Sequence, residues 1–154
     1  MALASSVIEN HGSTMGSAIL AGACYSASVF ALGVAFGTGR VLVLVPRVGE
    51  FAAVALETPF MLTAAWALSG FWWRHFVRAG RSAERLTMGA VAFALLIVAE
   101  LGLELLLGGS FATSLAKYGR PAGLLGLLAQ IAFGTFPMLR GQALARRRSR
   151  RCSA

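Results

Sequence analysis

The chain has 154 residues, of which 57% are hydrophobic and only 13% are charged, and its net charge is +8. Soluble domains carry about 25% charged residues, so this composition excludes an ordinary soluble domain and indicates that lipid is the main solvent. The positive charge lies in connectors between apolar segments and in the C-terminal tail. This distribution is typical of membrane proteins and argues against nucleic acid as a partner.

Residues 1–15 contain no lysine or arginine, whereas a cleaved signal peptide carries a positive region before its apolar stretch. We therefore expect a flexible N-terminus over 1–15 and an uncleaved first transmembrane helix over 16–37. Small residues near Ser26 resemble a cleavage site, so cleavage of this segment stays open. Small residues also recur at every fourth position of this helix and predict a closely packed helix face: Ala23, Ala27, Ala31, Ala35 and Gly39.

The next segment, 37–59, interrupts the apolar pattern with charged residues and two prolines, in the sequence GTGRVLVLVPRVGEFAAVALETP. Such an interruption marks a bend, a cavity or a site, because charges and free backbone groups are costly in lipid. Pro46 predicts that any helix ends near Val45, and the apolar run before it either continues the first helix or lies at the membrane interface. A second helix is expected over 49–73, with a kink at Pro59.

Trp72 and Trp73 close the second helix and are expected to form an interfacial belt. A hydrophilic connector, 74–85, follows them, and a third helix is expected over 86–107. This third helix is the most apolar of the set, yet it carries two glutamates one turn apart on a shared face: Glu100 and Glu104.

A fourth helix is expected over 121–139, because a proline stands at its first position and apolar residues follow. Gln130 lies near its middle, on a face of small residues. Residues 140–154 form a basic tail that we expect to be disordered.

The distribution of basic residues predicts the orientation of the chain. The connector 74–85 holds four arginines and the tail 140–154 holds six, whereas the other two connectors hold two basic residues each. Because basic loops stay in the cytoplasm, both termini are expected there. The sequence thus predicts an all-α bundle of four transmembrane helices, and its usage of Ala, Arg and Gly favours a bacterial inner membrane.

In this orientation, the outer half of the bundle receives most of the intramembrane charge. Each buried charge costs at least ~2.5–3.5 kcal/mol in lipid, so these side chains should turn inward and pair. We expect Arg40 to pair with Glu57 or Glu100, because a guanidinium can bridge two carboxylates. The predicted binding or ion-pair cluster is Arg40, Arg47, Glu57, Glu100 and Glu104, with Glu50 and Gln130 as additional polar groups.

This cluster allows two functions. It would bind a cationic group or carry protons in a small membrane-embedded binding or transport component, or it would fix the helix register in a structural or accessory subunit. An enzyme acting on lipid is least favoured, since no nucleophile set is recognisable. The histidines and cysteines lack metal-ligand spacing, so neither metal nor cofactor is expected.

The expected partners follow from the same features. One partner is the lipid bilayer. A second copy of the chain or another membrane protein is also expected, because four short helices enclose little room for a transport pathway within one copy. The tail is expected to contact anionic headgroups through the arginine-rich stretch that begins at Arg146 and ends at Arg151, or merely to fix the topology.

The segment 37–59 contains the patterns G-T-x-R, P-R-x-G-E and E-x-P-x-M, the last of which ends just beyond it. They resemble a group of small bacterial inner-membrane proteins with four helices and no assigned activity. The resemblance covers the first two helices and implies a multi-pass membrane protein, without a substrate or mechanism. The residues that carry it are Gly37, Thr38, Arg40, Pro46, Arg47, Gly49, Glu50, Glu57, Pro59 and Met61.

Overall fold

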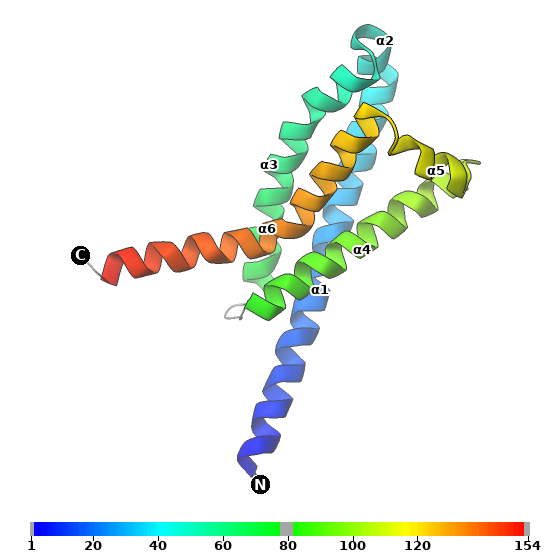
Figure 1. Ribbon diagram of the computed structural model, residues 1–154. Coiled ribbons are helices and arrows are strands. Elements are labelled where there is room, and N and C mark those ends of the chain that lie inside the picture. Colours follow the sequence, from blue (N-terminus) through cyan, green and yellow to red (C-terminus); the bar gives the residue numbers. More distant parts are fainter. Residues whose placement is uncertain (1, 78–81, 153–154) are drawn as a thin grey trace.

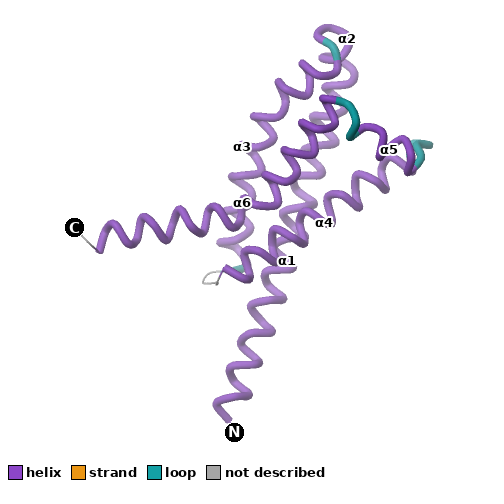
Figure 2. Tube along the Cα trace, viewed as in Figure 1, coloured by secondary structure: helices purple, strands orange, loops and turns teal. Residues whose placement is uncertain are grey.

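The computed structural model describes the backbone of residues 2–77 and 82–152, and the side chains of residues 15–77 and 82–142. Within these ranges the chain is helical and contains no strand (Figures 1 and 2). The elements are α1 (Ala2–Gly39), η1 (Arg40–Leu44), α2 (Val45–Val48), α3 (Glu50–Phe76), α4 (Ser82–Leu106), α5 (Phe111–Lys117) and α6 (Pro121–Cys152).

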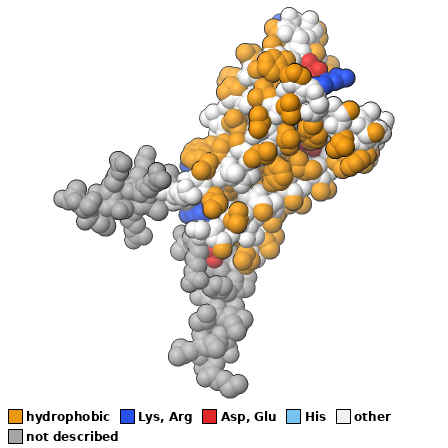
Figure 3. Space-filling view, viewed as in Figure 1, with side chains coloured by type: hydrophobic (Ala, Val, Ile, Leu, Met, Phe, Trp, Pro, Cys, Tyr) orange, Lys and Arg blue, Asp and Glu red, His pale blue; other side chains and the backbone are white. Residues whose placement is uncertain are grey.

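Four stretches of helix are long and apolar enough to cross a membrane: Met15–Val48, Glu50–Phe76, Ser82–Leu106 and Pro121–Gln142. The predicted all-α fold with four potential spans is therefore confirmed. Hydrophobic side chains cover most of the visible face, and most of the visible charged side chains lie toward its ends (Figure 3). This distribution is what a bilayer requires of the protein surface that it contacts.

The long helices form a four-membered ring. Helix α1 packs against α3 and α4, and α6 packs against the same two helices from the other side (Figure 1). Across the ring, the buried Tyr25 of α1 reaches α6, where its hydroxyl donates a 3.2 Å hydrogen bond to the carbonyl of Phe133. The aromatic side chains of Tyr25 and Phe133 also stack, with their ring centroids 4.4 Å apart. This contact fills the centre of the bundle with side chains.

Small residues bring α1 and α4 together, but they are not the residues that the sequence pattern singled out. Ala18 and Ala21 are fully buried, and a side chain at Gly22 would lie 2.7 Å from the carbonyl oxygen of Met88. The predicted packing stripe is wrong within this chain, because three of its alanines are exposed: Ala27, Ala31 and Ala35.

The break between the first two spans lies later than predicted. The backbone stays helical through Val48, with one widened π turn in which the N–H of Val45 donates to the carbonyl of Arg40. Pro46 directly follows this widened turn and lies in the first turn of α2. The chain turns at Gly49, whose φ of 81° is left-handed and favours glycine. The predicted helix end near Val45 is therefore wrong.

Other boundaries also differ from the expected ranges: α3 continues to Phe76 rather than ending at 73, and α4 begins at Ser82 rather than at 86. Helix α1 begins at Ala2, within the N-terminal segment expected to be flexible. Helix α6 runs through Pro137 and past position 139 to Cys152. The connector after α4 contains the short helix α5, which Ser110 initiates with a capping box: its hydroxyl accepts from the N–H of Thr113, whose side chain accepts from the N–H of Ser110.

Two predictions fall on parts of the chain that the structure does not describe. The side chains of the arginine-rich stretch from Arg146 to Arg151 lie outside the described residues, so its contact with headgroups stays a prediction. Arg78 and Arg81 of the basic connector also lie outside the described residues.

Candidate functional site

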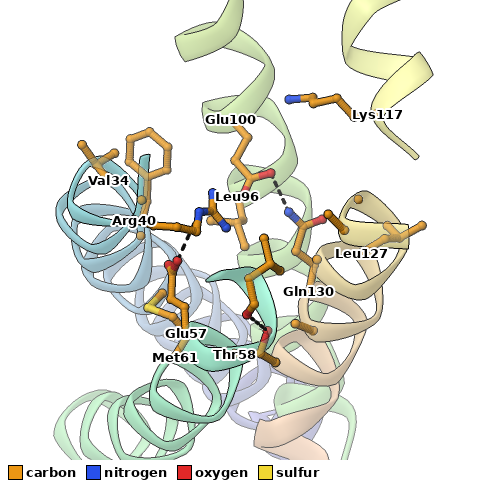
Figure 4. A pocket seen from close by; sticks show the side chains of 18 of the residues that line it. Val34, Arg40, Glu57, Thr58, Met61, Leu96, Glu100, Lys117, Leu127 and Gln130 are labelled. Carbon is orange, nitrogen blue, oxygen red and sulfur yellow. Dashed lines mark hydrogen bonds and ion pairs between the residues drawn. The ribbon is translucent and has the colours of Figure 1, made fainter. Parts of the chain in front are cut away.

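A cavity of about 850 Å³ opens between the four long helices, on the side of the bundle where α2 and α5 lie. One part of its wall is apolar and comes from all four helices: Val29, Phe30, Met61, Leu96, Leu127 and Phe133. The polar part of the wall combines side chains that lie far apart in the sequence: Arg40, Glu50, Glu57, Glu100, Glu104, Lys117 and Gln130. Figure 4 shows how several of these side chains lie.

Arg40 and Glu57 form the ion pair that the sequence predicts. The Nε atom of Arg40 lies 3.4 Å from Oε2 of Glu57, and the two side chains are 29% and 12% exposed. Arg40 reaches from η1 into the space between the helices, and Glu57 of α3 points toward it (Figure 4). The widened turn and the Gly49 turn together place these two residues opposite each other on neighbouring helices.

Glu100 makes its closest polar contact with α6 rather than with Arg40. The amide of Gln130 donates to Oε2 of Glu100 over 2.5 Å, which connects α4 to α6 (Figure 4). The sequence predicts both residues as polar members of the site but not this contact, because the register between α4 and α6 depends on both helices together.

Glu104 pairs with Lys117, the last residue of α5. From the sequence alone, Lys117 is only a basic residue in a connector and is not predicted to belong to the site. The available signal was its position as the first cation after Glu104 in the chain. Helix α5 brings that cation back over the cavity, and Lys117 is among the residues that line it.

The remaining predicted residues lie at the edge of the site or outside it. Glu50 lines the cavity but is 61% exposed, and its carboxylate is 4.0 Å from the guanidinium of Arg120. Exposed pairs of this kind contribute about 0–1 kcal/mol. Arg47 is exposed, does not line the cavity and joins no ion pair among the described residues.

Two acceptor atoms near the polar wall are buried without a hydrogen-bond donor among the described residues. They are Oε2 of Glu57 and Oε1 of Gln130. Arg40 lies at ion-pair distance from Oε2 of Glu57, but the alignment is not that of a hydrogen bond. An unsatisfied buried acceptor costs about 1–3 kcal/mol. This end of the cavity therefore holds hydrogen-bond acceptors for which the described residues supply no donor.

A second polar region lies at the opposite end of the bundle. The guanidinium of Arg85 lies 4.0 Å from the ring centroid of Trp73, and Arg140 donates to the carbonyl of Trp66. Trp73 is buried, so the prediction that it belongs to an interfacial belt is wrong. The sequence pattern indicates a role in topology for these arginines but does not predict their packing on tryptophan. Arg85 also donates to the carbonyl of Pro137, so both arginines connect helices at this end of the bundle.

Among the described residues no group of three or more His, Cys, Asp or Glu side chains is placed to hold a metal ion. Comparisons of the chain with protein-family models, with curated proteins and with solved structures found no match. The resemblance to small bacterial inner-membrane proteins therefore stays a prediction.

Proposed function

We propose that this chain is a multi-pass membrane protein that binds a small ligand in the cavity between its four long helices, as a binding or transport component. The observation that carries the proposal is the cavity itself, about 850 Å³ in volume and lined by apolar residues with a few charged ones. Ligand sites have this size and this mixture. Ionisable residues within membrane spans also mark functional sites more often than other residues do.

The proposal includes a location and an orientation. Arginines gather at the connector 74–85 and after position 139, so the positive-inside rule assigns that end to the cytoplasm and the cavity to the outer side of a bacterial inner membrane. A ligand would then enter from outside the cell, or laterally from the outer leaflet.

A structural or accessory subunit is the second candidate, favoured by a different observation. The exposed alanines of α1 form a face that nothing in the described chain covers: Ala27, Ala31 and Ala35. Small residues at this spacing let another helix approach closely. In that case the polar contacts of the cavity would serve to fix helix register, and the purified protein would be a defined oligomer or complex rather than a lone monomer.

Thiol accessibility tests the binding proposal. In a background with Cys24→Ala and Cys152→Ser, we would compare Gly126→Cys, which lines the cavity, with Gly102→Cys, which does not. A side-chain atom has open space at both positions. The reagent is neutral hydroxyethyl methanethiosulfonate, applied to protein in lipid nanodiscs.

We expect the cavity thiol to react about tenfold faster than the control thiol, because only the thiolate reacts and it forms only in contact with water. Equal, slow reaction at both positions would mean that the cavity is closed to water and ligand. That outcome would favour the structural role.

A further inference from the structure

The charges around the cavity do not balance. Two cations line it, Arg40 and Lys117, whereas four carboxylates do so: Glu50, Glu57, Glu100 and Glu104. Each cation already has a carboxylate partner, since Arg40 pairs with Glu57 and Lys117 pairs with Glu104. Arg120 lies 4.0 Å from Glu50 but does not line the cavity, and both side chains are mostly exposed. Glu100 is left with an amide donor and no ion pair among the described residues.

The two buried polar atoms near this wall that lack a hydrogen-bond partner are both acceptors. Oε2 of Glu57 and Oε1 of Gln130 are buried and accept no hydrogen bond from the described residues. Glu100 uses one oxygen on Gln130, so its second oxygen adds acceptor capacity at the same place. An ammonium group offers three donors and no acceptor, and it carries the charge that this wall lacks. An anionic group would add to the excess of negative charge.

The rest of the cavity wall requires an apolar partner. Aliphatic and aromatic side chains continue from the polar wall toward the centre of the bundle: Val29, Phe30, Leu96 and Phe133. A volume of about 850 Å³ exceeds what a single inorganic cation fills. The phenyl rings also favour a cation that passes over them.

Building on the proposed function, we propose that the ligand is an amphipathic organic cation. Its ammonium group would lie between Glu57, Glu100 and Gln130, and its apolar body would lie along the wall that Phe30, Leu96 and Phe133 provide. A free amine and the amine of a lipid headgroup share this chemistry.

Three probes of one shape test the inference. The full chain is placed in nanodiscs of phosphatidylcholine and phosphatidylglycerol and titrated calorimetrically with phenylbutylammonium, phenylbutanol and phenylbutyrate, with empty discs subtracted. We expect the ammonium to bind about tenfold more tightly than the neutral or the anionic analogue. Equal binding of all three, or tightest binding of the anion, would overturn the inference and leave the proposed binding function intact.

Matched carboxylate variants locate the site. Glu57→Gln and Glu100→Gln should each weaken ammonium binding about tenfold. Glu84→Gln, the same change on α4 outside the cavity, should leave binding unchanged. Unchanged binding in both cavity variants would overturn the inference. The comparison of probes on the unaltered chain decides the matter even where a variant fails to fold.

Two further results distinguish failure of the cation inference from failure of the binding function, and a lipid amine from a free amine. If no probe binds while Gly126→Cys still reacts rapidly, the cation inference is wrong and the binding function stands; if that thiol is also unreactive, both are wrong. Repeating the titration in discs that contain phosphatidylethanolamine distinguishes the sources of the amine. Loss of phenylbutylammonium binding there would support the inference with a lipid headgroup as the occupant, whereas unchanged binding would support it with a free amine.

Discussion

Arg40 and Glu57 combine two roles at the residue scale, since they line the cavity and also connect η1 to α3. Because both side chains are partly buried, breaking this pair should cost more stability than breaking a surface pair. Removing one partner leaves the other charge uncompensated where water solvates it poorly. The exposed pair of Arg120 and Glu50 provides an internal comparison. Both pairs link an arginine to a glutamate, and they differ mainly in exposure.

A double-mutant cycle on the inner pair should show clear coupling. We expect Arg40→Gln and Glu57→Gln each to lower the free energy of unfolding, and the double variant to lose less than the sum, with a coupling of about 1–3 kcal/mol. The measurement is denaturant unfolding of the protein in detergent micelles, followed by circular dichroism.

The same cycle on Arg120→Gln and Glu50→Gln is the control. Its coupling should stay near 0–1 kcal/mol, because both side chains are mostly solvated. Additive losses at Arg40 and Glu57 would contradict the view that their ion pair contributes to stability.

Glu100 and Gln130 show where residue-level prediction ends. Their presence within apolar helices identified them as polar members of the site from the sequence alone. Their contact depends on how α4 and α6 cross, which is set by glycines: a side chain at Gly89 would collide with the carbonyl of Gly134. Such a crossing arises from two surfaces together, so neither helix sequence specifies it. Lys117 was missed for a related reason, because a short capped helix returns it to the cavity.

The long helices are the elements that the sequence predicts best. These helices are longer than the ~20 residues that a helical span requires, and in lipid only helices and closed barrels satisfy the backbone hydrogen bonds. The faces of these helices are harder to predict. In α1 the buried face follows Ala18, Ala21 and Tyr25, whereas the more regular alanine stripe is exposed. Small residues lower the cost of close approach on any face, but packing decides which face is used.

The approach of α1 to α4 gives a prediction at the scale of elements. Gly22→Val would place its side chain 2.7 Å from the carbonyl oxygen of Met88 and should separate the helices. We expect a loss of about 1–3 kcal/mol in the free energy of unfolding, typical of overpacking. The matched control is Gly16→Val in the same helix, where the added atom meets nothing within 4 Å. Equal stability of the two variants, measured by denaturant unfolding in micelles, would count against this close approach.

The widened turn at η1 was beyond sequence prediction for a specific physical reason. A proline usually ends the helix before it, which is the basis for expecting an end near Val45. Here the turn from Arg40 to Leu44 takes an extra residue, so the helix passes Pro46 and stops at a glycine instead. Turns of this kind are frequent at functional sites. In this chain it begins at the arginine of the cavity.

At the scale of the whole molecule, four potential spans in sequence require that both termini lie on the same side of a membrane. In the proposed orientation, which rests on the basic connector and tail, that side is the cytoplasm. Green fluorescent protein fused to either terminus should therefore fluoresce, because it folds in the cytoplasm. Alkaline phosphatase inserted after Gly109 should be active, because it needs disulfides that form outside the cytoplasm.

The converse fusions supply the control for this topology. Alkaline phosphatase at either terminus should be inactive, and fluorescent protein after Gly109 should be dark. A dark fusion at only one terminus, with normal protein levels, would contradict the arrangement of four spans.

The contact between Tyr25 and Phe133 has a consequence for the proposed binding function. Phe133 belongs to the cavity wall, whereas Tyr25 lies on the other side of it in the closed centre of the bundle. The cavity is therefore closed at the centre of the bundle and does not continue through it. To release a ligand on the far side, α1 and α6 would have to part and give up both a buried hydrogen bond and a stacked ring pair. While this contact holds, a ligand bound in the cavity would have to leave on the side from which it entered.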